Sequence, residues 1–115
     1  MIEMLSRFDL AEGHNLTETE KSYQAFAKEV SARGLLHSAG KIGRRVQNTP
    51  MDTDAADAPK YYAIMRFRDR AQMDAAYAFL AEPHESSAFD AFHQALKSTT
   101  VNQVFTCWEI PDEEA

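Results

Sequence analysis

Cysteine is almost absent from this sequence, which contains only Cys107 among its 115 residues. An intramolecular disulfide is therefore excluded, and such sparse use of cysteine suits a reducing compartment. Long apolar runs are absent too, since no segment approaches the roughly 20 apolar residues of a membrane span. The first residues read as a strand and not as a basic segment followed by an apolar one. We therefore expect a cytoplasmic protein.

Positive charge is in the minority, with 12 Lys and Arg residues against 18 Asp and Glu residues and a net charge of −6. General nucleic-acid binding and docking on anionic membranes both need a cationic surface, so both classes are disfavoured. Glycine and proline are few, and 44% of the residues are apolar, as in an ordinary globular protein. We expect one domain over residues 1–110 and an acidic tail over residues 111–115.

Four segments predict strands. Residues 1–10 alternate between apolar and polar positions with a period of two, and residues 60–67 and 101–110 do the same. Residues 35–47 predict a weaker strand, because Gly40 and Gly43 favour a bulge or an edge position. Residues 48–59 have the composition of a loop.

Helical patterns fill the remaining segments. Thr17, with Glu20 three residues later, predicts the N-cap of a helix that ends at Gly34. Asp69 predicts the cap of a second helix. Beyond Pro83, the apolar spacing predicts either a kinked continuation of that helix or a separate short helix. The residues that carry this last pattern are Phe89, Phe92, His93 and Leu96.

The resulting order, β-α-β-β-α-(α)-β, predicts an α+β fold of ferredoxin-like type. Its four-stranded antiparallel sheet would carry the helices on one face and place the first and third strands in the centre. The helix-covered face is predicted to hold Ile2, Met4, Phe8, Ala63, Met65, Phe67, Val104, Trp108 and Ile110. The opposite face is predicted to hold Glu3, Leu5, Arg7, Tyr62, Ile64, Arg66, Phe105, Cys107 and Glu109.

This opposite face mixes large apolar side chains with opposite charges, whereas a solvated sheet face would be mostly polar. Such a mixture indicates a covered surface or the wall of a cavity. We therefore predict a ligand-binding set and an interface set on it. The ligand-binding candidates are Arg7, Arg45, Tyr62, Arg66 and Glu109, and the interface candidates are Leu5, Ile64 and Phe105.

In element order and facial pattern the chain resembles the dimeric α/β-barrel superfamily, whose members pack two ferredoxin-like sheets face to face. The run GRRVQNTPMDTD before YYAIMRFRDRAQMDAAY resembles an uncharacterised bacterial branch of it. The resemblance implies a homodimer that binds a small molecule, in a cavity between helices and sheet or inside the dimer barrel. Monooxygenase-like and isomerase-like enzymes and non-catalytic structural or sensing dimers all occur on this fold, so the function stays open.

The arginines allow two interpretations. Arg7, Arg45 and Arg66 could converge with Tyr62 on an anionic or carbonyl-bearing ligand, because the guanidinium fork binds a carboxylate through two hydrogen bonds. The simpler interpretation, which we favour, is that they pair with Glu3 and Glu109 within one chain or across a dimer.

An RNA-recognition module is a remote alternative with the same element order. Lys60, Tyr62, Ala63 and Phe67 match its third-strand signature, but Ile64 stands where a stacking aromatic belongs. The negative net charge also argues against it, so we expect no nucleic-acid or membrane partner.

Other candidate sites are weaker. Asp52, Asp54 and Asp57 lack the glycine and the glutamate of a calcium loop. His93 lies on an apolar helical stripe, which favours a packed histidine, and Cys107 favours a packed thiol over a nucleophile. No histidine has a second ligand at metal-binding spacing. We therefore expect no metal and no cofactor, and commit to no catalytic residue.

Overall fold

A strand of nine residues, β1 (Ile2–Leu10), lies inside an antiparallel sheet, between β4 (Tyr61–Phe67) and β5 (Thr100–Glu109). The computed structural model describes residues 1–82 and 88–111 of the chain. Two short strands, β2 (Ser38–Ala39) and β3 (Gly43–Arg44), pair with the outer edge of β4. The order β2-β4-β1-β5 confirms that the first and third predicted strands are central.

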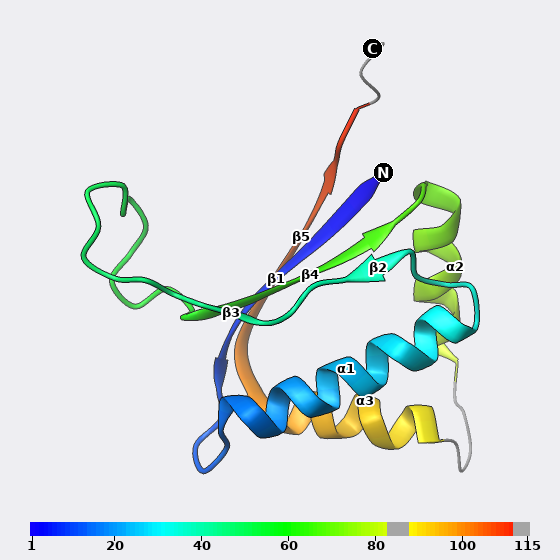
Figure 1. Cartoon of the computed structure of the whole chain (residues 1–115), viewed down its shortest axis with the longest axis horizontal. Coiled ribbons are helices and arrows are strands. Elements are labelled where there is room, and N and C mark those ends of the chain that lie inside the picture. The colour runs from blue at the N-terminus through cyan, green and yellow to red at the C-terminus, as the bar shows by residue number, and fades with distance from the viewer. Residues whose placement is uncertain (83–87, 112–115) are drawn as a thin grey trace.

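Three helices lie on one side of this sheet (Figure 1). They are α1 (Leu16–Ala32), α2 (Arg70–Ala81) and α3 (Ala88–Thr99), so the third helical pattern forms a helix of its own. The link that contains Pro83 and the side chains of Phe89 and Phe92 lie outside the described structure, as does the predicted tail beyond Pro111. No helix in residues 1–82 or 88–111 is long and apolar enough to cross a membrane.

The core lies between the sheet and α1. Tyr23, Phe26, Ala27 and Val30 occur three and four residues apart, so they share one face of α1, and all four are buried. From the sheet, Phe8, Ala63, Met65 and Phe67 meet them. Because these residues alternate with exposed or half-buried neighbours, the predicted facing of β1 and β4 is confirmed.

The facing of β5 differs from the prediction. The register pairs Met4 with Cys107 and Glu3 with Trp108, so Phe105, Cys107 and Glu109 lie on the helix side. Val104, Trp108 and Ile110 lie on the opposite face, where Trp108 is 59% exposed. Apolar residues occur at both odd-numbered and even-numbered positions of β5. Its hydrophobic pattern therefore does not show which of the two sets faces the helices. The pairing of β5 with β1 is irregular between Arg7 and Asp9 of β1, and it is regular from Ile2 to Arg7.

Of the two predicted helix caps, one is confirmed and the other is wrong. Asp69 caps α2 as predicted, because its carboxylate accepts a hydrogen bond from the Gln72 amide at 2.8 Å. Asn15, and not Thr17, caps α1, accepting from the Glu18 amide at 2.8 Å. Asparagine and threonine are both good caps, and here the helix begins at the earlier of the two.

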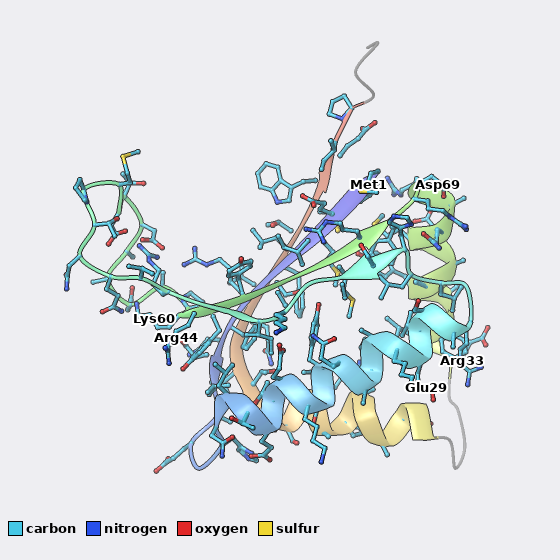
Figure 2. All side chains as sticks on the ribbon, in the orientation of Figure 1. Met1, Glu29, Arg33, Arg44, Lys60 and Asp69 are labelled. Atoms are coloured by element: carbon cyan, nitrogen blue, oxygen red, sulfur yellow. The ribbon has the colours of Figure 1, made fainter. Side chains whose placement is uncertain are left out.

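Residues 48–59 form a loop without helix or strand, as predicted. Figure 1 shows this loop projecting from the end of the sheet, away from the three helices. Figure 2 shows Arg44 and Lys60 at its base, and a backbone hydrogen bond of 2.7 Å joins Arg45 to Lys60 there.

Replacing Asn15 by Ala should lower the free energy of unfolding by about 1 kcal/mol, because the first turn of α1 loses its side-chain acceptor. Urea denaturation at a fixed protein concentration measures this change. Thr17→Ala is the matched control and should cost less than about 0.5 kcal/mol. An equal loss in both variants would contradict the assignment of Asn15 as the cap.

Candidate functional site

The sheet face that the helices leave uncovered has an apolar middle and charged ends. Leu5 and Ile64 are cross-strand neighbours in the middle of this face, and Thr106 lies beside Leu5 on β5. Glu3, Arg66 and Trp108 lie toward one end, and Arg7, Tyr62 and Val104 toward the other. We call this surface the uncovered face.

At the first end, Arg66 is already paired within the chain. Its Nε donates to the Glu3 carboxylate at 2.8 Å, and both side chains are partly exposed. The two residues lie directly opposite each other on β4 and β1, where opposite charges stabilise a sheet. The simpler interpretation of the arginines, a counter-ion within the chain, is therefore confirmed for Arg66.

At the second end, the projecting loop supplies the counter-ions. Arg45 donates through both terminal nitrogens to Asp54, at 2.6 and 2.7 Å, and Arg7 donates to the same carboxylate at 2.9 Å. Asp52 adds a contact of 3.1 Å to Arg45. These hydrogen bonds, from Arg45 first and then from Arg7, hold the pKa of Asp54 well below its usual range.

The ion pairs therefore persist at neutral pH. A carboxylate with a lowered pKa stabilises the folded state above the ordinary Asp pKa of about 3.9. That contribution is lost only as the pH falls through the lowered value. Glu109, the expected partner of these arginines, lies on the other side of the sheet.

Tyr62 is held by a close approach to the backbone of β3. It pairs with Gly43, and a Cβ at position 43 would overlap the Tyr62 ring. The ring therefore lies over the glycine, which explains why a glycine occurs inside this short strand.

The structure thus brings together only part of the predicted ligand-binding set. Arg7, Arg45 and Tyr62 are near one another, with Asp54 between the two arginines, whereas Arg66 lies at the other end of the face. The placement of Glu109 and Phe105 on the uncovered face is wrong, because the register of β5 turns both toward the helices. The ligand-binding role of the set stays a prediction.

A cavity of about 400 Å³ lies on the helix side of the sheet. All three helices and the strands β1, β4 and β5 contribute to it. Its walls are mostly apolar and rich in rings, including Phe8, Tyr23, Phe26, Phe67 and Phe105. Its size and character are those of a site for a small organic molecule.

A few polar groups interrupt these apolar walls. Ser6 lies on the sheet side, between Ala63 of β4 and Phe105 of β5, and its hydroxyl makes no hydrogen bond to any described residue. The Tyr23 hydroxyl donates to the Ile64 carbonyl at 3.4 Å, and burial raises the pKa of Tyr23 far above its usual value. His93 and Lys97 are one helical turn apart on α3.

His93 is half-buried and stacks on Phe26, with ring centroids 5.2 Å apart. Burial, and then the charge of Lys97, lowers the pKa of His93, while Asp90 acts in the opposite direction. The ring is therefore uncharged at neutral pH and can accept a proton from a ligand.

Tyr77 of α2 lines the cavity, and its hydroxyl contacts two sulfur atoms. Its hydroxyl lies 3.2 Å from Cys107 Sγ and 3.4 Å from Met4 Sδ. Burial and the hydrogen bond with Cys107 raise the pKa of Tyr77 to about 12, so the phenol stays protonated at neutral pH. Within the described residues, no group of three or more His, Cys, Asp or Glu side chains could hold a metal ion.

The sequence analysis assigned most of the cavity residues to the core, Phe105 to the interface set and none of them to the ligand-binding set. Two signals were present. Ser6 interrupts the apolar positions Met4 and Phe8 of β1, and Lys97 lies four residues after His93 on a helix with an apolar face. A polar residue on an otherwise core-facing stripe indicates either a satisfied buried group or a cavity, and only the structure distinguishes them.

Structural comparison shows the same architecture in other proteins. A mutant form of SnoaB from Streptomyces nogalater, a cofactor-independent oxygenase, matches with a TM-score of 0.65 and 15% identity over 96% of this chain and 93% of that one. The protein At3g17210 from Arabidopsis thaliana matches with a TM-score of 0.70 and 10% identity over 97% of each chain. The chain is also similar to a dimeric ferredoxin-like protein of unknown function from Jannaschia sp. CCS1, with a TM-score of 0.62 and 14% identity over 95% of this chain and 98% of that one.

The chain has the ferredoxin-like fold of these proteins. The predicted fold class is therefore confirmed, as is the resemblance at the level of the fold. No family model matches the sequence, and no curated protein matches it either. Since the ferredoxin-like fold supports many functions, the cavity and its residues have to carry the functional argument.

Asp54→Asn should loosen the projecting loop, because the amide cannot hold Arg45 and Arg7 as a carboxylate does. At pH 7 we expect trypsin to cleave at Arg44, Arg45 and Lys60 about fivefold faster than in the parent protein. Asp57→Asn is the matched control, since Asp57 is exposed on the same loop and makes no ion pair with any described residue. Equal cleavage of the two variants would contradict the anchoring role of Asp54.

Proposed function

We propose that this protein forms a homodimer through its uncovered face and binds a small, largely apolar molecule in the cavity between the sheet and the helices. The cavity is the observation that carries the ligand-binding part. The well-packed core of a small domain contains few voids larger than a water molecule. The cavity between the sheet and the helices, in contrast, measures about 400 Å³.

The exposed apolar residues of the uncovered face support the dimer. Tyr62, Val104, Trp108 and Ile110 are between 44% and 59% exposed, and they surround Leu5 and Ile64. A contiguous apolar surface with charged margins is typical of a protein–protein interface. Proteins with this fold are described as dimeric, including the Jannaschia protein.

A cofactor-independent oxygenase is the enzymatic candidate that the site supports best. SnoaB, with the same fold, carries out this class of reaction. An oxygenase of this kind has to remove a proton from its substrate so that the substrate itself can reduce O₂. In the cavity, His93 is an uncharged base in apolar surroundings, which suits that step.

A non-catalytic sensing or structural dimer is the second candidate. The pairing of Arg66 with Glu3, and of Arg7 and Arg45 with Asp54, favours it for the uncovered face, since these charges already have partners. The same pairing argues against the RNA-recognition alternative, because these arginines are not free to bind phosphates. The two candidates are distinguished by measuring oxygen uptake with an enolisable aromatic substrate, without added metal or flavin. The oxygenase should consume oxygen, whereas the non-catalytic dimer should not.

Ser6→Leu should fill part of the cavity and abolish ligand binding. Naphthalene-2-carboxamide is a suitable neutral probe, and its fluorescence reports binding. We expect the dissociation constant to rise more than about tenfold, while the free energy of unfolding rises by about 1 kcal/mol because leucine buries apolar surface there. The control is Ser31→Leu, on the exposed surface of α1. If both variants bind the probe like the parent protein, the cavity is not the site.

Ile64→Asp should prevent assembly, because a carboxylate in the middle of a buried interface costs several kcal/mol. Light scattering should then report a mass near the 13.0 kDa of one chain, and twice that value for the parent protein. Ser31→Asp places the same charge on exposed α1 and should leave the dimer intact. A parent protein of single-chain mass would refute the proposed dimer.

A further inference from the structure

The cavity has a closed interior and an opening, which the exposure of its lining residues locates. Phe8, Tyr23, Phe26 and Val30 are buried and belong to the interior. Four other lining residues are exposed, namely Tyr77, Lys97, Gln103 and Phe105, of which Phe105 is 61% exposed. A residue that both lines a cavity and meets solvent marks its opening. The opening is therefore bounded by α2, α3 and β5.

The only charged side chain among the described lining residues of the cavity is that of Lys97, since His93 is uncharged at neutral pH. Of the described residues that line the cavity, none is Asp or Glu, although the chain carries 18 acidic residues. The ammonium group of Lys97 is at the opening and makes no ion pair or hydrogen bond with any described residue. By contrast, Arg7, Arg45 and Arg66 are all held by carboxylates. The opening therefore offers a cation that has no ion-pair partner among the described residues, next to an apolar interior.

The backbone around Lys97 is held in place by short hydrogen bonds. Thr99 and Thr100 both donate through their hydroxyls to the Leu96 carbonyl at 3.1 Å. The Gln103 amide donates to the carbonyl and hydroxyl of Thr100 at 2.9 and 3.0 Å. These bonds fix the junction of α3 and β5, so the rim of the opening is already arranged before a ligand arrives.

We propose that the ligand is an aromatic molecule with one negatively charged oxygen group, a carboxylate or an ionised phenol, and that Lys97 binds this group at the opening. The apolar body would enter the interior, among the rings of Phe8, Tyr23 and Phe26, which favour an aromatic partner. This inference rests on the proposed ligand-binding function and adds the class of ligand to it. Charge attraction at a partly solvated site then selects anions over neutral analogues.

A purely structural role for Lys97 makes a different prediction. Lys97 lies in the last turn of α3, where a positive charge stabilises the helix whether or not a ligand binds. That role would change the stability of the protein but would not change the preference between charged and neutral ligands. Ligand preference is therefore the measurement that distinguishes the two roles.

The test compares naphthalene-2-carboxylate with naphthalene-2-carboxamide, which have nearly the same shape and differ in charge. Their dissociation constants are measured at pH 7.5 by probe fluorescence. We expect the parent protein to bind the carboxylate about fivefold more tightly, as for a partly exposed ion pair. Lys97→Gln should abolish this preference while its affinity for the carboxamide stays unchanged. Added salt should also weaken the preference in the parent protein.

Lys28→Gln is the matched control, because it removes the same charge from an exposed position on α1 that does not line the cavity. It should keep the preference for the carboxylate. Equal binding of both probes by the parent protein, or a preference that survives in Lys97→Gln, would overturn the inference while the proposed function stands. Failure of the parent protein to bind either probe would overturn the proposed function itself, and this inference with it.

Discussion

The pairing register of β1 with its two neighbours determines which side chains reach the cavity and which reach the uncovered face. Side chains alternate along a strand, so a slip of one residue would exchange the two sets completely. On β1 this alternation sends Met4, Ser6 and Phe8 to the helices, and Glu3, Leu5 and Arg7 away from them. One strand thus contributes to the cavity and to the uncovered face at once, through alternate residues.

Much of the fold could be predicted from the sequence because periodicity and caps act locally. The stripe Tyr23–Val30 and the cap Asp69 are examples that the structure confirms. The phase of β5 could not be predicted, since Phe105 and Trp108 fit either face equally well by hydrophobicity. Its register depends on hydrogen bonds to β1, which are long-range in sequence.

The candidate site was harder to predict than the fold. The cavity arises from three helices and three strands that together leave space unfilled, and no segment of sequence encodes such a space by itself. Asp54 illustrates the same limit. It looked like part of an acidic loop, whereas its partners, Arg7 and Arg45, become neighbours only when the loop returns to the end of the sheet.

The projecting loop owes its position to polar contacts at defined points and not to a packed core. Arg45, with Asp52 and Asp54, holds its base, and Thr49 closes a turn on Asp52 with hydrogen bonds of 2.7 and 3.0 Å. Residues 55–57 are exposed and belong to the loop that projects from the end of the sheet, away from the three helices. Lengthening the loop at residues 55–57 should therefore leave the sheet and the helices unchanged. These residues are the natural place to insert a tag or a reporter peptide.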